Sequence, residues 1–158
     1  MHILRNSSLA VLLGMACVSQ AMPSAIPSDK KLEAKVEKTL SKMTLDEKIG
    51  QMTELSIDVL GEWKDGEFQL NKEKVYNAIA KYKVGSVLNS PGPVAQTPQK
   101  WQEIIGTIQE LSMKEIGIPC IYGLDQNHGT TYTLGGTLFP QNINIGASFN
   151  PQLAYDAA

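Results

Sequence analysis

Asp125 and His128 are the residues of this sequence whose types and spacing could do chemistry. They follow a short apolar run, Ile118–Tyr122, which is bounded by glycine and proline. Such a run is typical of a buried parallel strand. After Gly123 the sequence becomes polar and rich in glycine. An acid at the carboxyl end of a buried strand lies where α/β proteins place their binding sites. Asp125 is therefore a candidate binding residue. From its position alone, a carboxylate that caps a loop or pairs with a buried lysine or arginine is an equal alternative.

The sequence around these residues gives little support for a metal site, a serine nucleophile or a phosphate-binding loop. Apart from His2 in the N-terminal segment, His128 is the only histidine, and Asp125 with His128 falls short of the ligand set of a metal site. The sequence has no Gly-x-Ser-x-Gly nucleophile motif, and Gly135–Gly136 lacks the spacing of a phosphate-binding loop. We expect His128 to order its loop through a hydrogen bond to the backbone, and we expect neither a metal nor a cofactor.

The two cysteines do not indicate a disulfide. Cys17 lies in the N-terminal segment that we expect to be removed, which leaves Cys120 without a partner. Because Cys120 lies within the apolar run, we expect a small buried apolar side chain. A catalytic thiol is the weaker interpretation, since the surroundings of Cys120 are apolar.

Residues 1–21 have the pattern of a signal peptide. Arg5 supplies a positive charge, and Leu9–Val18 is an apolar run too short to span a bilayer. Ser19–Ala21 places small residues where a signal peptidase cleaves, so we expect cleavage after Ala21 and export to the periplasm or the medium. The alternative is a lipid anchor at Cys17, which the sequence supports less well because Gly14 stands where a lipobox has leucine.

The charge of the chain excludes one class of partner. The net charge is −2, and removal of residues 1–21 takes only Arg5 and makes it −3. Binding to nucleic acid depends on a basic patch, for which the sequence gives no sign. We therefore expect no nucleic-acid partner, and the length suits one globular unit with a core of its own.

Four helices are predicted between the N-terminal segment and the apolar run. After a linker at residues 22–31, apolar residues at helical spacing predict a helix over 32–43. Thr44 and Glu47 form a capping box at the start of a second helix, Asn71 caps a third, and Thr97 followed by Pro98 begins a fourth. The residues that we expect in the core are Leu45, Ile49, Met52, Val75, Ala78, Ile79, Tyr82, Trp101, Ile104, Ile105, Ile108 and Leu111.

Two strands alternate with these helices. One is predicted at residues 86–89 and the other at the apolar run, with Gly117 ending the helix between them. The alternation of helices and strands predicts a parallel α/β fold. Residues 56–70 read as an irregular excursion or a loose hairpin. Asn150 and Pro151 begin a further helix close to the last residue, from which we expect the sequence to be a fragment of a longer domain.

Four motifs, in this order, resemble the N-terminal region of family 3 glycoside hydrolases, the β-glucosidase group. They are MTLDEKIGQM at residues 43–52, VGSVLN at 84–89, GLDQNHG at 123–129 and GGTLFPQNINIGASFNP at 135–151. The resemblance covers residues 32–158. It implies the N-terminal portion of a (β/α)8 TIM-like barrel, incomplete in this chain.

The resemblance also implies a function and one site residue. Family members hydrolyse terminal non-reducing β-D-glucosyl or related residues by a retaining mechanism that uses two carboxylates. Neither carboxylate motif occurs here, so we assign no catalytic residue and expect residues 1–158 to be inactive alone. Asp125 matches the family's sugar-binding Asp, which favours a β-glucoside or oligosaccharide as its ligand. Gln141 stands where the family has His, so no role is carried over to that position.

Two alternatives to a glycosidase remain open at this stage. One is a non-catalytic periplasmic carbohydrate-binding protein on the same barrel. The other is a periplasmic structural domain in which Asp125 only braces its loop. The sequence indicates neither the sugar and its linkage nor an oligomeric state.

Overall fold

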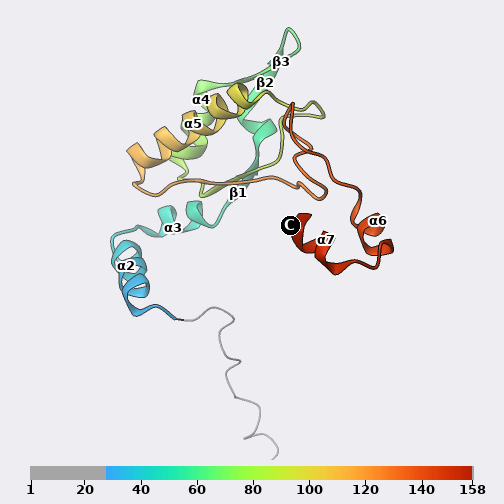
Figure 1. Ribbon diagram of the computed structural model, residues 1–158. Coiled ribbons are helices and arrows are strands. Elements are labelled where there is room, and N and C mark those ends of the chain that lie inside the picture. The colour runs from blue at the N-terminus through green and yellow to red at the C-terminus, as the bar shows by residue number, and fades with distance from the viewer. Residues whose placement is uncertain (1–27, 158) are drawn as a thin grey trace, which may run out of the picture. The chain divides into compact units, whose positions relative to one another are not determined.

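The computed structural model describes residues 28–157, in two compact units that divide after Lys42 (Figure 1). The predicted signal peptide, Cys17 and most of the predicted linker lie outside the described residues. In the first unit, α2 (Lys30–Leu40) begins two residues before the predicted helix. Asp29 caps it, since its Oδ1 accepts hydrogen bonds from the backbone N–H groups of Lys31 and Leu32 at 2.8 and 3.3 Å.

The second unit begins with α3 (Leu45–Gln51), whose predicted capping box is confirmed. The Thr44 hydroxyl accepts from the Glu47 N–H at 3.2 Å, and the Glu47 carboxylate accepts from the Thr44 N–H at 2.8 Å. The hydrogen bond from the Thr44 backbone lowers the pKa of Glu47.

The prediction that one face of α3 lies in the core is wrong. Leu45, Ile49 and Met52 are 72, 55 and 88 % exposed. The physical reason is that α3 meets its unit along Gly50, where a Cβ atom would lie 2.1 Å from the carbonyl oxygen of Tyr82. A helix that packs on this side directs the Leu45–Ile49–Met52 face away from the core.

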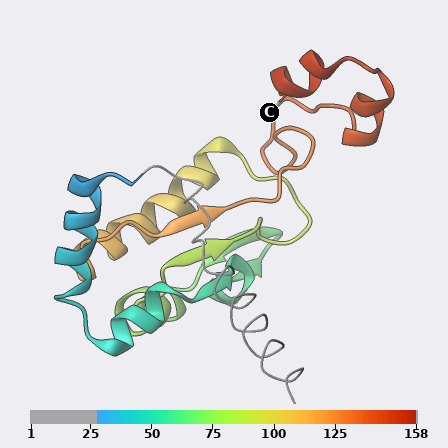
Figure 2. The same cartoon turned by 90° about the horizontal axis from the view of Figure 1, so that it is seen from below.

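A three-stranded parallel sheet forms the centre of the second unit. Its strands are β1 (Glu54–Ser56), β4 (Ser86–Leu88) and β5 (Ile121–Gly123), in the order β1-β4-β5. Figure 2 shows β4 in yellow-green beside β5 in orange. The register aligns Leu55 with Val87 and Tyr122. The predicted parallel α/β class is confirmed, although β1 was not predicted.

The prediction of a buried strand at residues 118–122 is wrong in two respects. The strand begins only at Ile121, and Ile121 is 71 % exposed. Within the described residues β5 is an edge strand with β4 on one side, so half of its backbone and one face have no neighbour. The prediction for Cys120 is confirmed, because this residue is buried in the core. Its N–H donates to Oε1 of Gln109 at 3.0 Å, and its carbonyl accepts from Nε2 of the same side chain.

Of the two interpretations of residues 56–70, the hairpin is confirmed, and it is regular rather than loose. A short 3-10 helix, η1 (Ile57–Leu60), leads into β2 (Gly61–Lys64), which pairs antiparallel with β3 (Glu67–Leu70). Asp65 and Gly66 have φ of 52° and 80°, as the two central residues of a type I′ turn require. Asp-Gly between two strands is a strong hairpin signal, and the sequence therefore contained the information for this turn.

Asn71 caps the next helical segment as predicted, with Oδ1 accepting from the N–H groups of Glu73 and Lys74 at 3.0 and 3.1 Å. The segment is α4 (Lys72–Val75) followed without a break by the π-helical turn η2 (Tyr76–Lys81). Its residues Val75, Ala78 and Ile79 are buried, but Tyr82 is 60 % exposed, against prediction. The helix ends at Lys81, and the chain turns at Lys83 with a φ of 57°, so Tyr82 no longer follows the helical face.

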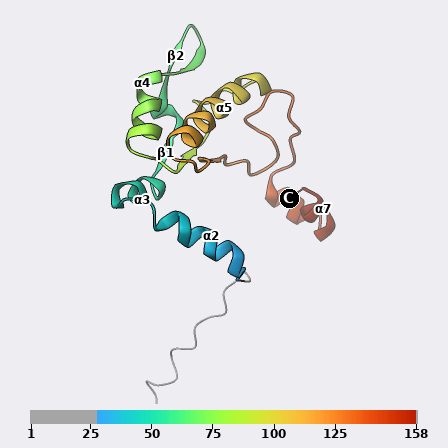
Figure 3. The same cartoon turned by 90° about the vertical axis from the view of Figure 1, so that its left-hand side faces the viewer.

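The helix α5 (Pro98–Glu115) covers one face of the sheet together with η2, beside which it lies in Figure 3. Thr97 caps it through a 3.1 Å hydrogen bond from the Lys100 N–H, as predicted. Its Trp101, Ile104 and Ile108 are buried as expected, whereas Ile105 and Leu111 are only partly buried. Gly117, with a φ of +74°, ends the helix as predicted. The core between helices and sheet contains Ile57, Leu60, Phe68, Val75, Ala78, Ile79, Val84, Val87, Ile104, Ile108 and Cys120.

The opposite face of the sheet is open within the described residues. It carries Glu54, Ser86 and Ile121, which are in register with one another. The Ser86 hydroxyl donates to Oε2 of Glu54 at 3.0 Å. The chain ends in α6 (Asn142–Ala147) and α7 (Pro151–Ala157). The predicted helix start is confirmed, since Oδ1 of Asn150 accepts from the Gln152 N–H at 3.0 Å.

Candidate functional site

Asp125 lies two residues beyond β5, at the carboxyl edge of the parallel sheet. It is exposed, and no described residue gives its carboxylate a hydrogen bond or an ion pair. The two structural alternatives, a loop cap and a partner for a buried cation, both need such a bond. Neither alternative therefore has its partner among the described residues.

The loop after Asp125 is held together by its backbone. The Thr130 N–H donates to the Thr137 carbonyl at 2.7 Å, and the Phe139 N–H donates to the His128 carbonyl at 2.9 Å. Gly129 makes this closure possible, since its φ is +94° and a Cβ atom there would lie 2.4 Å from the Thr137 oxygen. The expectation that His128 orders its loop through a hydrogen bond to the backbone is confirmed, although the bond is made by its main chain. No described residue hydrogen-bonds its imidazole, and it is the carbonyl of His128 that orders the loop.

A second set of bonds fastens this loop to the start of α5. The Tyr132 carbonyl accepts hydrogen bonds from the Gln96 N–H at 2.9 Å and from Nε1 of Trp101 at 3.0 Å. The Leu134 N–H donates to the Gln96 carbonyl at 2.8 Å. The segment that follows β4 therefore supports the loop that follows Asp125.

Tyr122 connects the ends of β5 and β4. Its hydroxyl donates to the Asn89 carbonyl at 2.8 Å, and its ring meets Trp101 edge to face, with the centroids 5.8 Å apart. Burial raises the pKa of Tyr122, and the negative charges of Asp58 and of an ionised Cys120 would raise it further. The Tyr122 phenol is therefore a neutral hydrogen-bond donor at physiological pH.

Asp58 joins the end of β1 to the same edge, and the sequence reasoning missed it. Its Oδ1 accepts from the Gly92 N–H at 3.0 Å, and its Oδ2 accepts from the Ser56 hydroxyl at 3.3 Å. Asp58 could have been recognised as a candidate residue of the carboxyl edge only if β1, which ends two residues before it, had been predicted. The residues after β1, β4 and β5 thus meet at one edge of the sheet.

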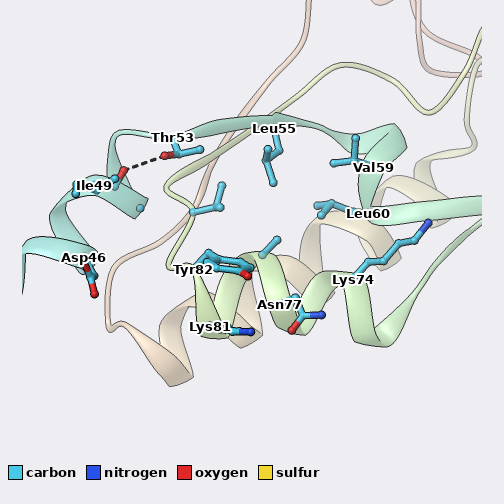
Figure 4. Close-up of a pocket in the computed structure, with 13 residues that line it drawn as sticks. Asp46, Ile49, Thr53, Leu55, Val59, Leu60, Lys74, Asn77, Lys81 and Tyr82 are labelled. Carbon is cyan, nitrogen blue, oxygen red and sulfur yellow. Dashed lines mark hydrogen bonds between the residues drawn. The ribbon is translucent and has the colours of Figure 1, made fainter.

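A hollow of the described residues lies elsewhere, between α3, β1, η1 and the α4–η2 segment (Figure 4). Its volume is about 830 Å³, and it is mainly apolar, with Ile49, Leu55 and Leu60 among its walls. None of the residues that line it comes from the segments after β4 or β5. Parallel α/β folds bind ligands at the carboxyl ends of their strands, so we place the candidate site at Asp125 rather than in this hollow.

A second hollow, of about 410 Å³, adjoins the loop after Asp125. His128, Asn142 and Ile145 are among its lining residues, so α6 forms one of its walls. Between residues 28 and 157 there is no group of three or more His, Cys, Asp or Glu side chains that could hold a metal ion. No helix in the described part of the chain is long and apolar enough to cross a membrane.

Comparison with known proteins agrees with the motifs at this edge. The glycosyl hydrolase family 3 N-terminal domain matches residues 44–158, which is most of the chain. The chain belongs to glycosyl hydrolase family 3. A lysosomal β-glucosidase of Dictyostelium discoideum is 38 % identical over 132 residues, which cover 78 % of this chain. The same match covers 16 % of that relative, so the chain spans only a small part of its length. The family 3 match contains every element from α3 to α7, and with them Asp125.

Proposed function

We propose that this chain is the N-terminal part of a β-glucosidase-like glycoside hydrolase, and that Asp125 binds the terminal sugar of the substrate. The observation that carries the proposal is the exposed Asp125 carboxylate at the carboxyl edge of the sheet, without a partner among the described residues. An ionised carboxylate accepts hydrogen bonds from neighbouring sugar hydroxyls, and such charge-assisted bonds are stronger than neutral ones. Family membership and the name of the Dictyostelium relative support the choice of a β-glucoside as the substrate.

The proposal includes an incomplete barrel. In a closed barrel the face of the sheet that carries Glu54, Ser86 and Ile121 would be the inner one, filled by side chains of further strands. The open state of this face supports the view that further strands of the complete protein complete the barrel. The two carboxylates of a retaining mechanism would then also come from outside residues 1–158. Turnover of an aryl glucoside by residues 1–158 alone would contradict this part.

Export is a further part of the proposal. It rests on Arg5, the apolar run Leu9–Val18 and the small residues Ser19–Ala21. The mature protein would begin at Met22. The N-terminal sequence of the exported protein checks this, and an intact Met1 or a lipid on Cys17 would contradict it.

The test of the Asp125 assignment is steady-state kinetics of the complete enzyme on an aryl β-glucoside. Asp125→Ala removes an acceptor of two charge-assisted bonds, each worth about 1.5–3 kcal/mol. Because these bonds also hold the ring in its reactive geometry, we expect kcat/KM to fall on the order of a hundredfold or more, with kcat itself lowered. Asp125→Asn keeps one acceptor and should lose less.

Glu110→Ala is the matched control, since Glu110 is an exposed acid on α5. It should leave kcat/KM unchanged. Circular dichroism checks that each variant is folded. If folded Asp125→Ala keeps kcat/KM within about threefold of wild type, well below the tenfold that 1.4 kcal/mol represents, Asp125 only braces its loop. A complete wild-type protein that binds glucosides without cleaving them would instead support the non-catalytic alternative.

A further inference from the structure

Trp63 lies on the hairpin that leaves the same edge of the sheet as Asp125. The hairpin strand β2 follows β1 through η1, so it begins at the carboxyl end of β1. Asp125 follows β5, which lies in the sheet on the other side of β4 from β1. Both residues therefore belong to segments that start at the carboxyl ends of parallel strands, where such folds bind their ligands.

The indole of Trp63 packs on the backbone of Gly92, in the loop after β4. A Cβ atom at Gly92 would lie 2.8 Å from Cζ2 of Trp63, so the ring can come this close only to a glycine. The N–H of Gly92 donates a 3.0 Å hydrogen bond to Oδ1 of Asp58. The loops after β1 and β4 are thus joined at the place where the ring lies.

A buried neighbour fixes the orientation of the indole. Phe68 is directly opposite Trp63 in the hairpin and lies in the core. The two rings meet edge to face, with centroids 6.0 Å apart and planes at 65°. Trp63 itself remains 41 % exposed. An aromatic ring that is fixed on one side and open to solvent on the other can bind a ligand at a small cost in conformational entropy.

We propose that Trp63 stacks on the second sugar ring of the substrate, on the leaving-group side of the bond that is cleaved. This inference rests on the proposed function, in which Asp125 holds the terminal ring. Neighbouring strands are about 4.8 Å apart, so the loops after β1 and β5 start about 10 Å from each other, a distance comparable with two linked pyranose rings. The face of an aromatic ring carries negative charge density and attracts the C–H bonds on the face of a pyranose.

Two substrates distinguish stacking of Trp63 on a second sugar ring from a structural role that would affect all substrates alike. Methyl β-glucoside has no second ring, whereas cellobiose has one. In the complete enzyme, we expect Trp63→Ala to lower kcat/KM for cellobiose about tenfold, mainly through KM, since aromatic contacts of this kind are worth about 0.5–1.5 kcal/mol. The kcat/KM for methyl β-glucoside should stay within about twofold. Trp63→Phe keeps an aromatic face and should recover most of the loss.

Tyr76→Ala is the control, because Tyr76 is an exposed aromatic residue on η2, outside the loops of the carboxyl edge. It should change neither substrate's kinetics. If Trp63→Ala leaves both substrates unaffected, or lowers both equally, then the ring only shields Gly92 and the inference is wrong. If the wild-type enzyme cleaves neither substrate, the proposed function fails and the inference fails with it.

Discussion

The hydroxyl of Tyr122 donates a 2.8 Å hydrogen bond to the carbonyl oxygen of Asn89, and this bond holds an unusual backbone conformation in place. Asn89 has a φ of 75°, in the left-handed region that asparagine tolerates better than most residues. Its N–H donates to the Gly123 carbonyl at 3.0 Å. Both backbone groups of Asn89 are therefore bound by β5, and the turn after β4 is fixed to the strand that leads to Asp125.

Removal of the Tyr122 hydroxyl should weaken this connection. Tyr122→Phe leaves the partly buried carbonyl of Asn89 without its donor, which should lower the free energy of unfolding of the complete protein by about 1–2 kcal/mol. Tyr76→Phe is the control, since no described residue bonds to the Tyr76 hydroxyl, and it should change nothing. Urea unfolding measures both. Equal stability of Tyr122→Phe and wild type would mean that water replaces the lost bond at no cost.

Features that depend on a few neighbouring residues were predictable from the sequence. The capping box of Thr44 and Glu47 and the caps at Asn71 and Thr97 formed as expected, because each is complete within three residues. Gly117 ends α5 for a similarly local reason, since glycine adopts a positive φ at little cost.

Features that depend on distant partners were not predictable in this way. β1 has only three residues, two of them polar, and is a strand because it pairs with β4. The burial of Ile121 and of the α3 face was wrongly predicted because an apolar pattern does not say which neighbours are present. At the candidate site, Asp125 was proposed from its position after an apolar run and from a motif. Asp58 and Trp63 were missed, because their contact with Gly92 joins residues about thirty positions apart.

Alkaline pH should reveal the burial of Cys120. Burial raises the pKa of its thiol from an ordinary value of 9.0 to about 11. A raised pKa means that the unfolded state loses its proton first, so this stabilisation is complete below about pH 9 and disappears as pH rises towards 11. The free energy of unfolding should therefore fall over this range, with a contribution from Cys120 on the order of 2 kcal/mol.

The comparison that isolates this contribution is wild type against Cys120→Ala in the complete protein. At pH 7.5 the alanine variant should be the less stable, because it leaves a cavity in the core. The difference should shrink by pH 10.5, since only wild type carries the thiol. Tyr122, whose pKa is also raised, is present in both proteins. A stability difference that stays constant from pH 7.5 to 10.5 would show that the thiol titrates alike in the folded and unfolded states.

Two glycines in helices should respond in opposite ways to a methyl group. Gly50 lies where α3 meets the turn before β4, and an added Cβ would stand 2.1 Å from the Tyr82 oxygen and 2.7 Å from the Lys83 oxygen. The same contact carries the 3.0 Å hydrogen bond from the Gly85 N–H to the Gly50 carbonyl. Gly50→Ala must push these segments apart, so the complete protein should lose at least about 1–3 kcal/mol of stability.

Gly106 provides the matched comparison, since it lies in α5 and an added Cβ would meet no atom within 4 Å. Gly106→Ala keeps the helical backbone and restricts the unfolded chain, so it should stabilise the protein by about 0.5–1 kcal/mol. Urea unfolding of the two variants and of wild type measures both changes in the free energy of unfolding, one expected to be a loss and the other a gain. Should Gly50→Ala prove as stable as wild type, the close packing of α3 against the turn at Tyr82 and Lys83 would be wrong. Should Gly106→Ala be destabilising, another part of the complete protein would have to cover that side of α5.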